Sequence, residues 1–232
     1  MSTLSTRRRH EPIVPPLNNG DRLTQREFHR RYEAHAGREK FELIGSIVYL
    51  ASPLRRPQAN YHEELSFALG LYRRATPGVE LLLDATTILG EESEPQPDLA
   101  LRILPEYGGQ SRDTPAQYVQ GPAELLTEIA HSTLSIDMHQ KKTDYQHGGV
   151  QEYLVLCVEE RELYWFNFKS RRLITPDARG IYRSRIFPGL WIDGPALLAL
   201  ESTKVAKAVR KGLKSPEHAR FMKRLQMTAR KR

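Results

Sequence analysis

The 232-residue chain has little cysteine and no long apolar run. Its one cysteine, Cys157, lies in the segment YLVLCV. A single cysteine forms no intramolecular disulfide, which suits a reducing compartment, and its apolar neighbours predict a small core residue. No window approaches the roughly 20 apolar residues needed to cross a bilayer, and no apolar segment follows the N-terminal arginines as in a signal peptide. The sequence therefore predicts a cytoplasmic protein with no membrane association.

Acidic residues are scarce at the C-terminal end. Residues 204–232 hold eleven Lys and Arg but one acidic residue, Glu217, whereas the rest of the chain has 24 basic and 27 acidic residues. The net charge of +7 therefore belongs mainly to this end. It predicts either a tail that binds nucleic acid or a solvated helix that aids solubility. The candidate nucleic-acid contacts are Lys204, Lys207, Arg210, Lys211, Lys214, Arg220, Lys223 and Arg224.

The composition, 39% hydrophobic and 27% charged, is that of a globular protein, and the length suits one domain with a substantial core or at most two small ones. Residues 1–20, rich in Pro, Arg and Asn, are predicted to be a disordered tail. Residues 21–200 are predicted to form the domain, and residues 201–232 a basic helical tail.

The hydrophobic pattern predicts an α/β or α+β domain on a central mixed sheet flanked by helices, with extra β-hairpins. Helices are predicted over 23–34, with Thr24 as N-cap, over 62–75, over 136–148, and from about 195 into the basic tail. A hairpin is predicted around Gly45, and later hairpin strands near 172–176 and 180–187. Five further strands are predicted over 79–89, 97–103, 124–130, 152–158 and 162–168. The helix over 136–148 is long enough for a crossover, so the strands that flank it can be parallel.

Two carboxylates stand where apolar strands should exclude them. Asp98 opens PDLALRI, and Glu128 interrupts LLTEIA. If the two strands share a sheet, the carboxylates can meet at one end and bind a divalent cation, which would offset the cost of keeping Glu128 charged. The alternative is that Asp98 starts a strand after a turn and that Glu128 faces solvent at a strand end.

A lysine is the third element of this candidate site. Lys141 follows Glu128 by thirteen residues, on the predicted helix, from which an ammonium could reach back over the strand end. Beside a metal it could orient water and stabilise charge on a phosphoryl oxygen. Its alternative is an exposed pair with Asp137, and Lys142 competes for the same role because Tyr145 lies three residues from one lysine and four from the other.

Ordered motifs through most of the chain, about 23–200, resemble the Uma2 family of restriction endonuclease-like proteins, a branch of the PD-(D/E)XK nuclease superfamily. The motifs are LT...EF from Leu23, FELIG from Phe41, His62, Pro97-Asp98, LLTEIAHST, the string Asp137-x3-Lys141-x3-Tyr145-x3-Gly149-Val150-x-Glu152-Tyr153, and FPGL from Phe187.

The resemblance implies that Asp98, Glu128 and Lys141 look like the family's catalytic residues. It further implies that Asp98 and Glu128, with the backbone carbonyl of Ile129, would hold Mg²⁺ or Mn²⁺. The superfamily usually places its lysine two residues after the glutamate, where this chain has Ala130, so the resemblance assigns that role to Lys141. Accessory roles are implied for Glu42 and His62; Tyr145 also matches the family, although packing between helix and sheet is its simpler interpretation.

The leading prediction is a metal-dependent endonuclease that hydrolyses DNA phosphodiester bonds. The alternatives are a DNA-binding or regulatory protein that kept the fold without cleaving, and a protein-interaction subunit. DNA is the expected partner. A homodimer is one expected arrangement, because nucleases that cut both strands often act as dimers.

Overall fold

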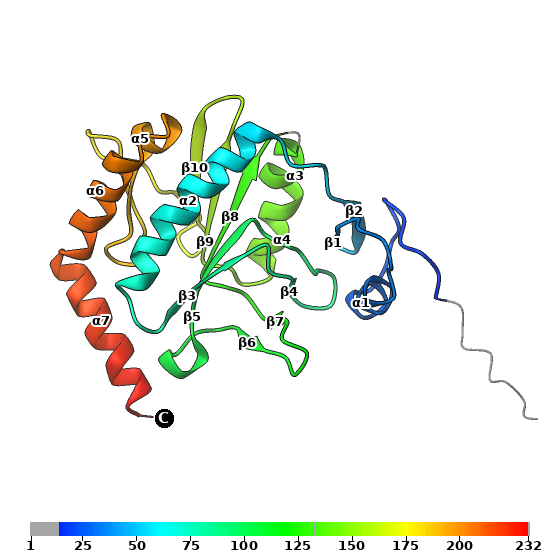
Figure 1. Cartoon of the computed structure of the whole chain (residues 1–232). Helices are drawn as coiled ribbons and strands as arrows, with labels where there is room; N and C mark the ends of the chain where they lie inside the picture. Colours follow the sequence, from blue (N-terminus) through cyan, green and yellow to red (C-terminus); the bar gives the residue numbers. More distant parts are fainter. Residues whose placement is uncertain (1–13, 132, 232) are drawn as a thin grey trace, which may run out of the picture.

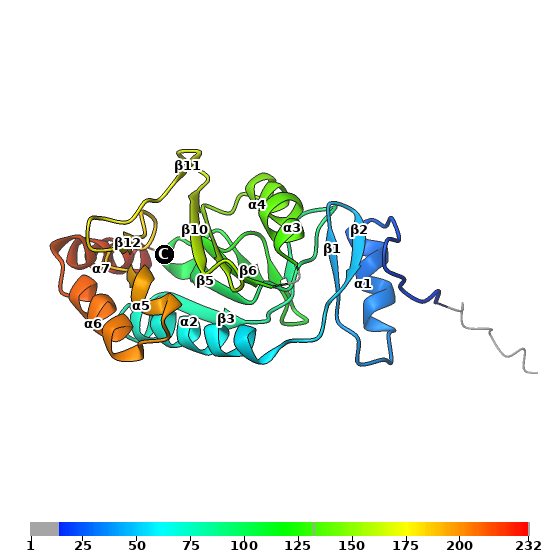
Figure 2. The same cartoon turned by 90° about the horizontal axis from the view of Figure 1, so that it is seen from above.

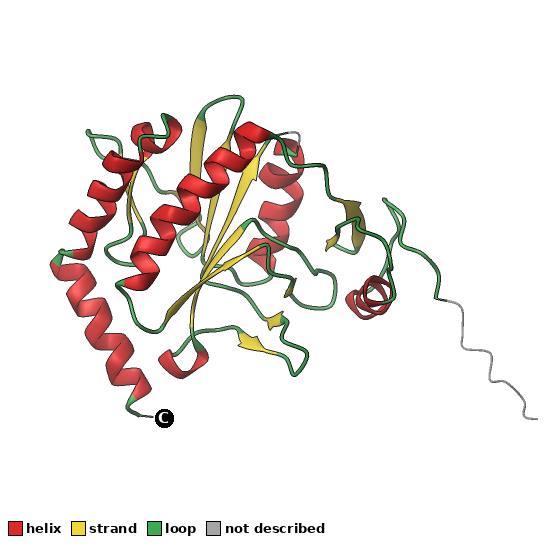
Figure 3. Cartoon of the chain, viewed as in Figure 1, coloured by secondary structure: helices red, strands yellow, loops and turns green. Residues whose placement is uncertain are grey.

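The computed structural model describes residues 14–131 and 133–231. Its helices are α1 (Gln25–Glu33), α2 (Arg56–Arg74), η1 (Pro105–Tyr107), α3 (Leu134–Ile136), the π-helix η2 (Asp137–Lys141), α4 (Lys142–His147), α5 (Gly194–Leu198), α6 (Ser202–Leu213) and α7 (Pro216–Ala229). The strands are β1 (Phe41–Ile44), β2 (Ile47–Leu50), β3 (Val79–Leu83), β4 (Thr87–Ile88), β5 (Leu99–Ile103), β6 (Arg112–Asp113), β7 (Val119–Gln120), β8 (Leu125–Ala130), β9 (Glu152–Cys157), β10 (Glu162–Asn167), β11 (Arg172–Leu173), β12 (Ile181–Arg183) and β13 (Trp191–Asp193). Figures 1 and 3 show their arrangement.

A six-stranded mixed sheet forms the centre, in the order β11-β10-β9-β8-β5-β3. Strands β8 and β9 are parallel, and the crossover between them carries α3, η2 and α4. The other neighbouring pairs are antiparallel. The predicted mixed sheet with one parallel pair is therefore confirmed.

Helices cover both faces of this sheet. In β8 every residue is buried, and alternate side chains enter two different clusters: Leu125 and Ile129 face α2, whereas Leu126 and Ala130 face α4. In Figure 2 the sheet lies between α2 on one side and α3 and α4 on the other. Cys157, as predicted, is a buried core residue in the α4 cluster. Because alternate strand residues share a face, Glu128 lies on the α4 side with Ala130.

The N-terminal lobe, formed by α1, β1 and β2, packs beside the sheet with a small core of its own (Figure 2). Its helix begins as predicted, since the Thr24 hydroxyl accepts a hydrogen bond from the Glu27 N–H. Its hairpin turns at Gly45 and Ser46, which have φ values of 55° and 65°. A two-residue turn with two positive φ angles matches the twist of the strands, so the predicted hairpin is confirmed.

Three predicted boundaries are wrong. Helix α2 begins at Arg56, six residues before the predicted start, with Pro57 in its first turn. The strand predicted over 79–89 ends at Leu83, because Asp84 takes a left-handed conformation with φ 50°. The single C-terminal helix is three helices, interrupted by Leu200 with φ 55° and by the Ser215 cap of α7.

Part of each predicted tail is packed against a core of the protein. Residues 1–13 of the N-terminal one lie outside the described residues, and within 14–20 Leu17 is buried in the core of the N-terminal lobe. At the other end, α6 and α7 contribute Val205, Val209, Phe221 and Leu225 to the main core. The basic segment is thus an integral part of the domain. Among the described residues no helix is both long and apolar enough to cross a membrane.

Candidate active site

Lys141 lies inside the protein among three carboxylates. Its Nζ is 3.0 Å from Oε1 of Glu128 on β8, 3.0 Å from Oε2 of Glu42 on β1, and 3.7 Å from Oδ1 of Asp137. The lysine is only 6% exposed. The cluster therefore joins the N-terminal lobe, the sheet and the crossover helix through one ammonium.

The π-helix explains how residues four apart in sequence face the sheet together. Asp137, Lys141 and Tyr145 are all buried. In an α-helix a step of four residues advances about 40° beyond a full turn, so three residues at this spacing drift around the helix. The wider turn over Asp137–Lys141 takes up part of this drift. The same turn leaves Lys142 on another side, with its Nζ 4.5 Å from the centre of the Phe166 ring.

Glu128 uses one of its two carboxylate oxygens for hydrogen bonds. Oε1 accepts hydrogen bonds from Lys141 Nζ at 3.0 Å and from the Tyr145 hydroxyl at 2.7 Å. Oε2 accepts no hydrogen bond from any described residue. Glu128 is 4% exposed, so the interpretation of Glu128 as a solvent-facing residue at a strand end is wrong.

Asp98 lies beside Glu128, just before the first residue of β5. The antiparallel register pairs Leu99 with Thr127, which places Asp98 opposite Glu128. Oδ2 of Asp98 accepts a hydrogen bond of 2.6 Å from the N–H of Ile129, and Oδ1 has no hydrogen-bond partner among the described residues. Each of the two carboxylates therefore keeps one oxygen that accepts no hydrogen bond from the described residues.

Burial sets the protonation of this site. Burial raises the pKa of Asp98 to about 6, although the Ile129 N–H and Lys141 act in the opposite direction. Burial also raises the pKa of Glu128 well above its usual range, against the lowering effect of Lys141. For Lys141, burial would lower the pKa, but the carboxylates of Glu128, Glu42 and Asp137 outweigh it and hold the pKa well above its usual range. The lysine is therefore charged at neutral pH.

Helix α2 contacts the backbone beside both carboxylates. Gln58 donates from Nε2 to the Ile129 carbonyl at 2.8 Å, and one turn later His62 Nε2 lies 3.1 Å from the Asp98 carbonyl. A carbonyl only accepts, so the imidazole donates. The carbonyl predicted as a metal ligand thus already accepts one hydrogen bond, and its second lone pair remains.

The chemistry of the donors fits a divalent cation. Such ions prefer carboxylate and carbonyl oxygens. The site offers three of them where β5 begins beside β8: Oδ1 of Asp98, Oε2 of Glu128 and the Ile129 carbonyl. A second set of donors shares Asp98: one atom each of His62, Asp84 and Asp98 lie within 4.8 Å of one another. In the described part of the chain this is the one group of three or more His, Cys, Asp or Glu with such spacing. Asp84 follows β3, outside the predicted site.

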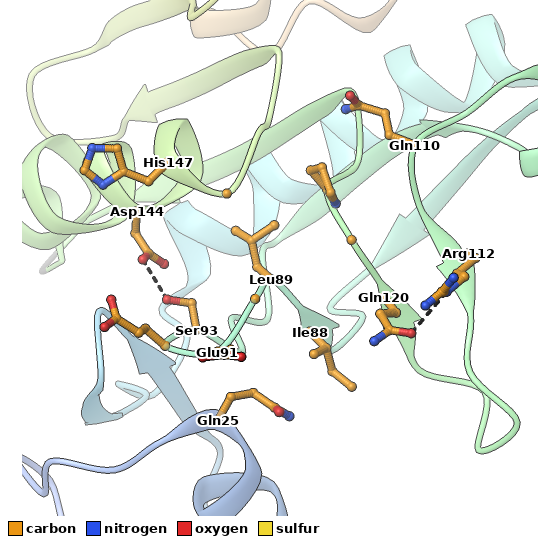
Figure 4. A pocket seen from close by; sticks show the side chains of 15 residues that line it. Gln25, Ile88, Leu89, Glu91, Ser93, Gln110, Arg112, Gln120, Asp144 and His147 are labelled. Carbon is orange, nitrogen blue, oxygen red and sulfur yellow. Dashed lines mark hydrogen bonds between the residues drawn. The ribbon is translucent and has the colours of Figure 1, made fainter.

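A hollow of about 750 Å³ lies between α4 and the segment that follows β4 (Figure 4). Ser93 and Asp144 form part of its wall: the Ser93 hydroxyl donates to Oδ1 of Asp144 at 2.6 Å. Three acidic residues line it, Glu91, Glu92 and Asp144, against one arginine, Arg112. This excess of carboxylates disfavours a bound phosphate, and none of Asp98, Glu128 and Lys141 lines the hollow.

The structure brings together most of the predicted site residues. Asp98, Glu128, Lys141, Glu42 and Tyr145 are linked directly or through neighbouring backbone, and His62 contacts the Asp98 carbonyl. The eight basic candidates lie elsewhere, on α6 and α7 or, for Lys214, between them. Gln58 and Asp84 were missed. Gln58 precedes His62 by four residues, so it would have been found by helical spacing had the helix been predicted to start earlier.

Comparison with known proteins identifies the family. The sequence profile of Uma2, described as "Putative restriction endonuclease", matches residues 26–200. The chain belongs to the Uma2 family. A solved structure from Anabaena variabilis ATCC 29413, described as "a putative nuclease belonging to DUF820", aligns with a TM-score of 0.58 at 11% identity and covers 76% of this chain and 98% of that one. At this identity the likeness concerns the fold. Comparison with curated proteins gave no match. The Uma2 match ends before α6, so α6 and α7 lie outside it.

Proposed function

We propose that this Uma2 protein is a Mg²⁺- or Mn²⁺-dependent endodeoxyribonuclease. The observation that carries the proposal is the pair of neighbouring carboxylates, Asp98 and Glu128, each with one oxygen that accepts no hydrogen bond from the described residues, beside the charged Lys141. Family and fold, both nuclease-like, support it. Fold alone does not fix an activity, so the assignment depends on these side chains.

In this proposal Asp98 and Glu128 hold the cation, with the Ile129 carbonyl as a further ligand. A bound Mg²⁺ or Mn²⁺ would polarise a phosphate and lower the pKa of a coordinated water. Lys141 balances the negative charge of the cluster and holds the Glu128 carboxylate in place through the 3.0 Å contact. Its ammonium also stabilises charge that develops on a phosphoryl oxygen. Tyr145 donates a hydrogen bond to the same carboxylate oxygen.

The test is cleavage of supercoiled, linear and single-stranded DNA with Mg²⁺, Mn²⁺ or EDTA. Asp98→Asn, Glu128→Gln and Lys141→Met should each reduce the rate by at least about 100-fold, since each removes a group that holds the cation or stabilises charge. Asp144→Asn is the matched control, because this carboxylate lies on α4, three residues after Lys141, but contacts Ser93. Cleavage that persists in all three variants would mean a contaminating nuclease and would contradict the proposal.

The same experiment separates the alternative functions. Salt-sensitive DNA binding without cleavage under every metal tried would favour a binding or regulatory protein on the nuclease fold. Absence of any DNA affinity at low salt would favour a protein-interaction subunit.

A further inference from the structure

The exposed face of α7 carries cations without acidic partners. Arg220, Lys223 and Arg224 recur at three- and four-residue spacing, so they lie on one face of the helix, and Lys231 follows just beyond its end; all four are exposed. With Met227 and Thr228 they line a hollow of about 310 Å³. Among the described residues of α6 and α7, only Lys204 forms an ion pair, with Glu201.

This face is held rigidly because the opposite face of α7 is in the core. Phe221 and Leu225 are buried in the main cluster, and His218 Nε2 lies 3.0 Å from the Thr76 hydroxyl at the end of α2. Arg224 stacks over the Phe221 ring, with its guanidinium carbon 5.1 Å from the ring centre. The cations are therefore presented from a fixed helix rather than from a loose tail.

We propose that this face of α7 is a docking surface for the phosphate backbone of duplex DNA, separate from the catalytic cluster. Nucleic-acid interfaces are polar and strongly positive, whereas the centres of protein interfaces are apolar and poor in charge. On α7 the one large exposed apolar side chain is Met227, at 50% exposure, with the cations around it. The charge pattern thus favours a polyanion over an acidic protein.

Helix α2 sets the distance between this surface and the catalytic cluster. Gln58, near its start, contacts the Ile129 carbonyl, and Thr76, just after its end, contacts His218 of α7. At a rise of about 1.5 Å per residue the two contacts are about 27 Å apart. That length corresponds to about eight base pairs, at about 3.4 Å each. That one duplex reaches both places rests on the proposed function, whereas binding of DNA to α7 does not.

The experiment measures binding of fluorescent duplexes of 6 to 24 base pairs, the shortest closed as hairpins, in EDTA over a range of salt. The variant is Arg220→Gln/Lys223→Gln/Arg224→Gln. The matched control, Lys169→Gln/Arg171→Gln/Arg172→Gln, removes the same charge from exposed positions around the turn between β10 and β11. All substituted side chains are exposed, and thermal unfolding verifies that both variants fold.

On 24 base pairs we expect the α7 variant to bind about 10- to 100-fold more weakly at 0.15 M salt, with a salt slope lower by about 2 to 3, because three phosphate contacts are lost. The control should change affinity less than about threefold. Wild-type affinity should rise steeply between 6 and 12 base pairs, and the α7 variant should lack this rise.

Equal losses of affinity in variant and control, or no wild-type binding at low salt, would overturn the docking surface. A smooth rise with length would overturn the span. Cleavage is assayed separately. If the wild-type protein cleaves no DNA but the α7 variant still binds DNA more weakly than wild type, only the proposed function is refuted.

Discussion

The Tyr145 hydroxyl and Glu128 Oε1 are 2.7 Å apart, and this oxygen also contacts the ammonium of Lys141. Two donors from one helix therefore fix the orientation of a buried carboxylate on the neighbouring strand. Since both donors use Oε1, the carboxylate turns Oε2 away from them. The lysine and the tyrosine thus position Glu128 as well as offset the cost of burying it.

Lys141→Met should destabilise the protein strongly. Removing the ammonium leaves the carboxylates of Glu128, Glu42 and Asp137 buried without a cation, and loss of one partner of a buried ion pair costs about 3–5 kcal/mol. Urea unfolding at pH 7.5 measures this, and the loss should shrink at pH 5 as Glu128 and Asp137, whose pKa values are raised by burial, take up protons. The control is Lys142→Met, whose ammonium lies over Phe166. Equal effects of the two substitutions would contradict the buried charge cluster.

Asp98→Asn should stabilise the metal-free protein. The folded pKa of about 6 lies above the ordinary value of 3.8, so the folded state binds more protons than the unfolded state between these values, and the free energy of unfolding falls as pH rises through this interval. Asparagine keeps an acceptor for the Ile129 N–H without the charge. We expect a gain of up to about 3 kcal/mol at pH 7.5 and little gain below pH 4, measured by urea unfolding in EDTA. A variant less stable than wild type at pH 7.5 would contradict this account.

Binding of Mn²⁺, followed by calorimetry or electron paramagnetic resonance, should distinguish the two donor sets that share Asp98. If the cation lies between Asp98 and Glu128, Glu128→Gln should weaken binding by at least about tenfold, while Asp84→Asn, at an exposed side chain 3.7 Å from Lys40, should change it little. The opposite ranking would place the cation with His62 and Asp84. In either case binding should weaken as pH falls below about 6, because Asp98 must lose its proton.

Glu152→Ala should impair folding without altering the chemistry of the candidate site. The buried Glu152 carboxylate accepts hydrogen bonds from Trp165 Nε1 at 3.1 Å, from the Ser184 hydroxyl at 2.7 Å and from the Arg185 N–H at 2.7 Å. Leaving these donors unsatisfied should cost about 3 kcal/mol or more. Differential scanning calorimetry measures the loss.

The matched control is Glu162→Ala, at an exposed residue that contacts the Tyr164 hydroxyl. At low temperature, any DNA cleavage per folded molecule should stay at the wild-type value in both variants. Wild-type stability of Glu152→Ala would contradict the structural role assigned to this family residue.

The sequence predicted the strands well because their burial follows directly from apolar runs such as LLTEIA and YLVLC. It also predicted that Glu128 needs a partner, since an acid inside such an apolar run is costly to bury without one. It could not rank Lys141 above Lys142 by helical geometry, because a π-turn leaves no pattern in residue type. Family spacing favoured Lys141, the lysine that contacts Glu128.

Other features were hidden by locally stronger patterns. The apolar stripe of Val205, Val209, Phe221 and Leu225 was obscured by eleven cations, so two core helices were interpreted as a tail. Asp84 was placed inside a strand because β-branched residues follow it, and its left-handed turn depends on tertiary pairing. Gln58 was missed with the first turns of α2.

Ala130 leaves no room for a longer side chain beside Glu128 on β8. Its side chain shares the Glu128 face of β8 and is 1% exposed, in the apolar cluster that includes Tyr145 and Val155. A lysine at this position would place four methylenes and a charge in a closed apolar space, so the fold accepts an ammonium beside Glu128 from the helix and not from the strand.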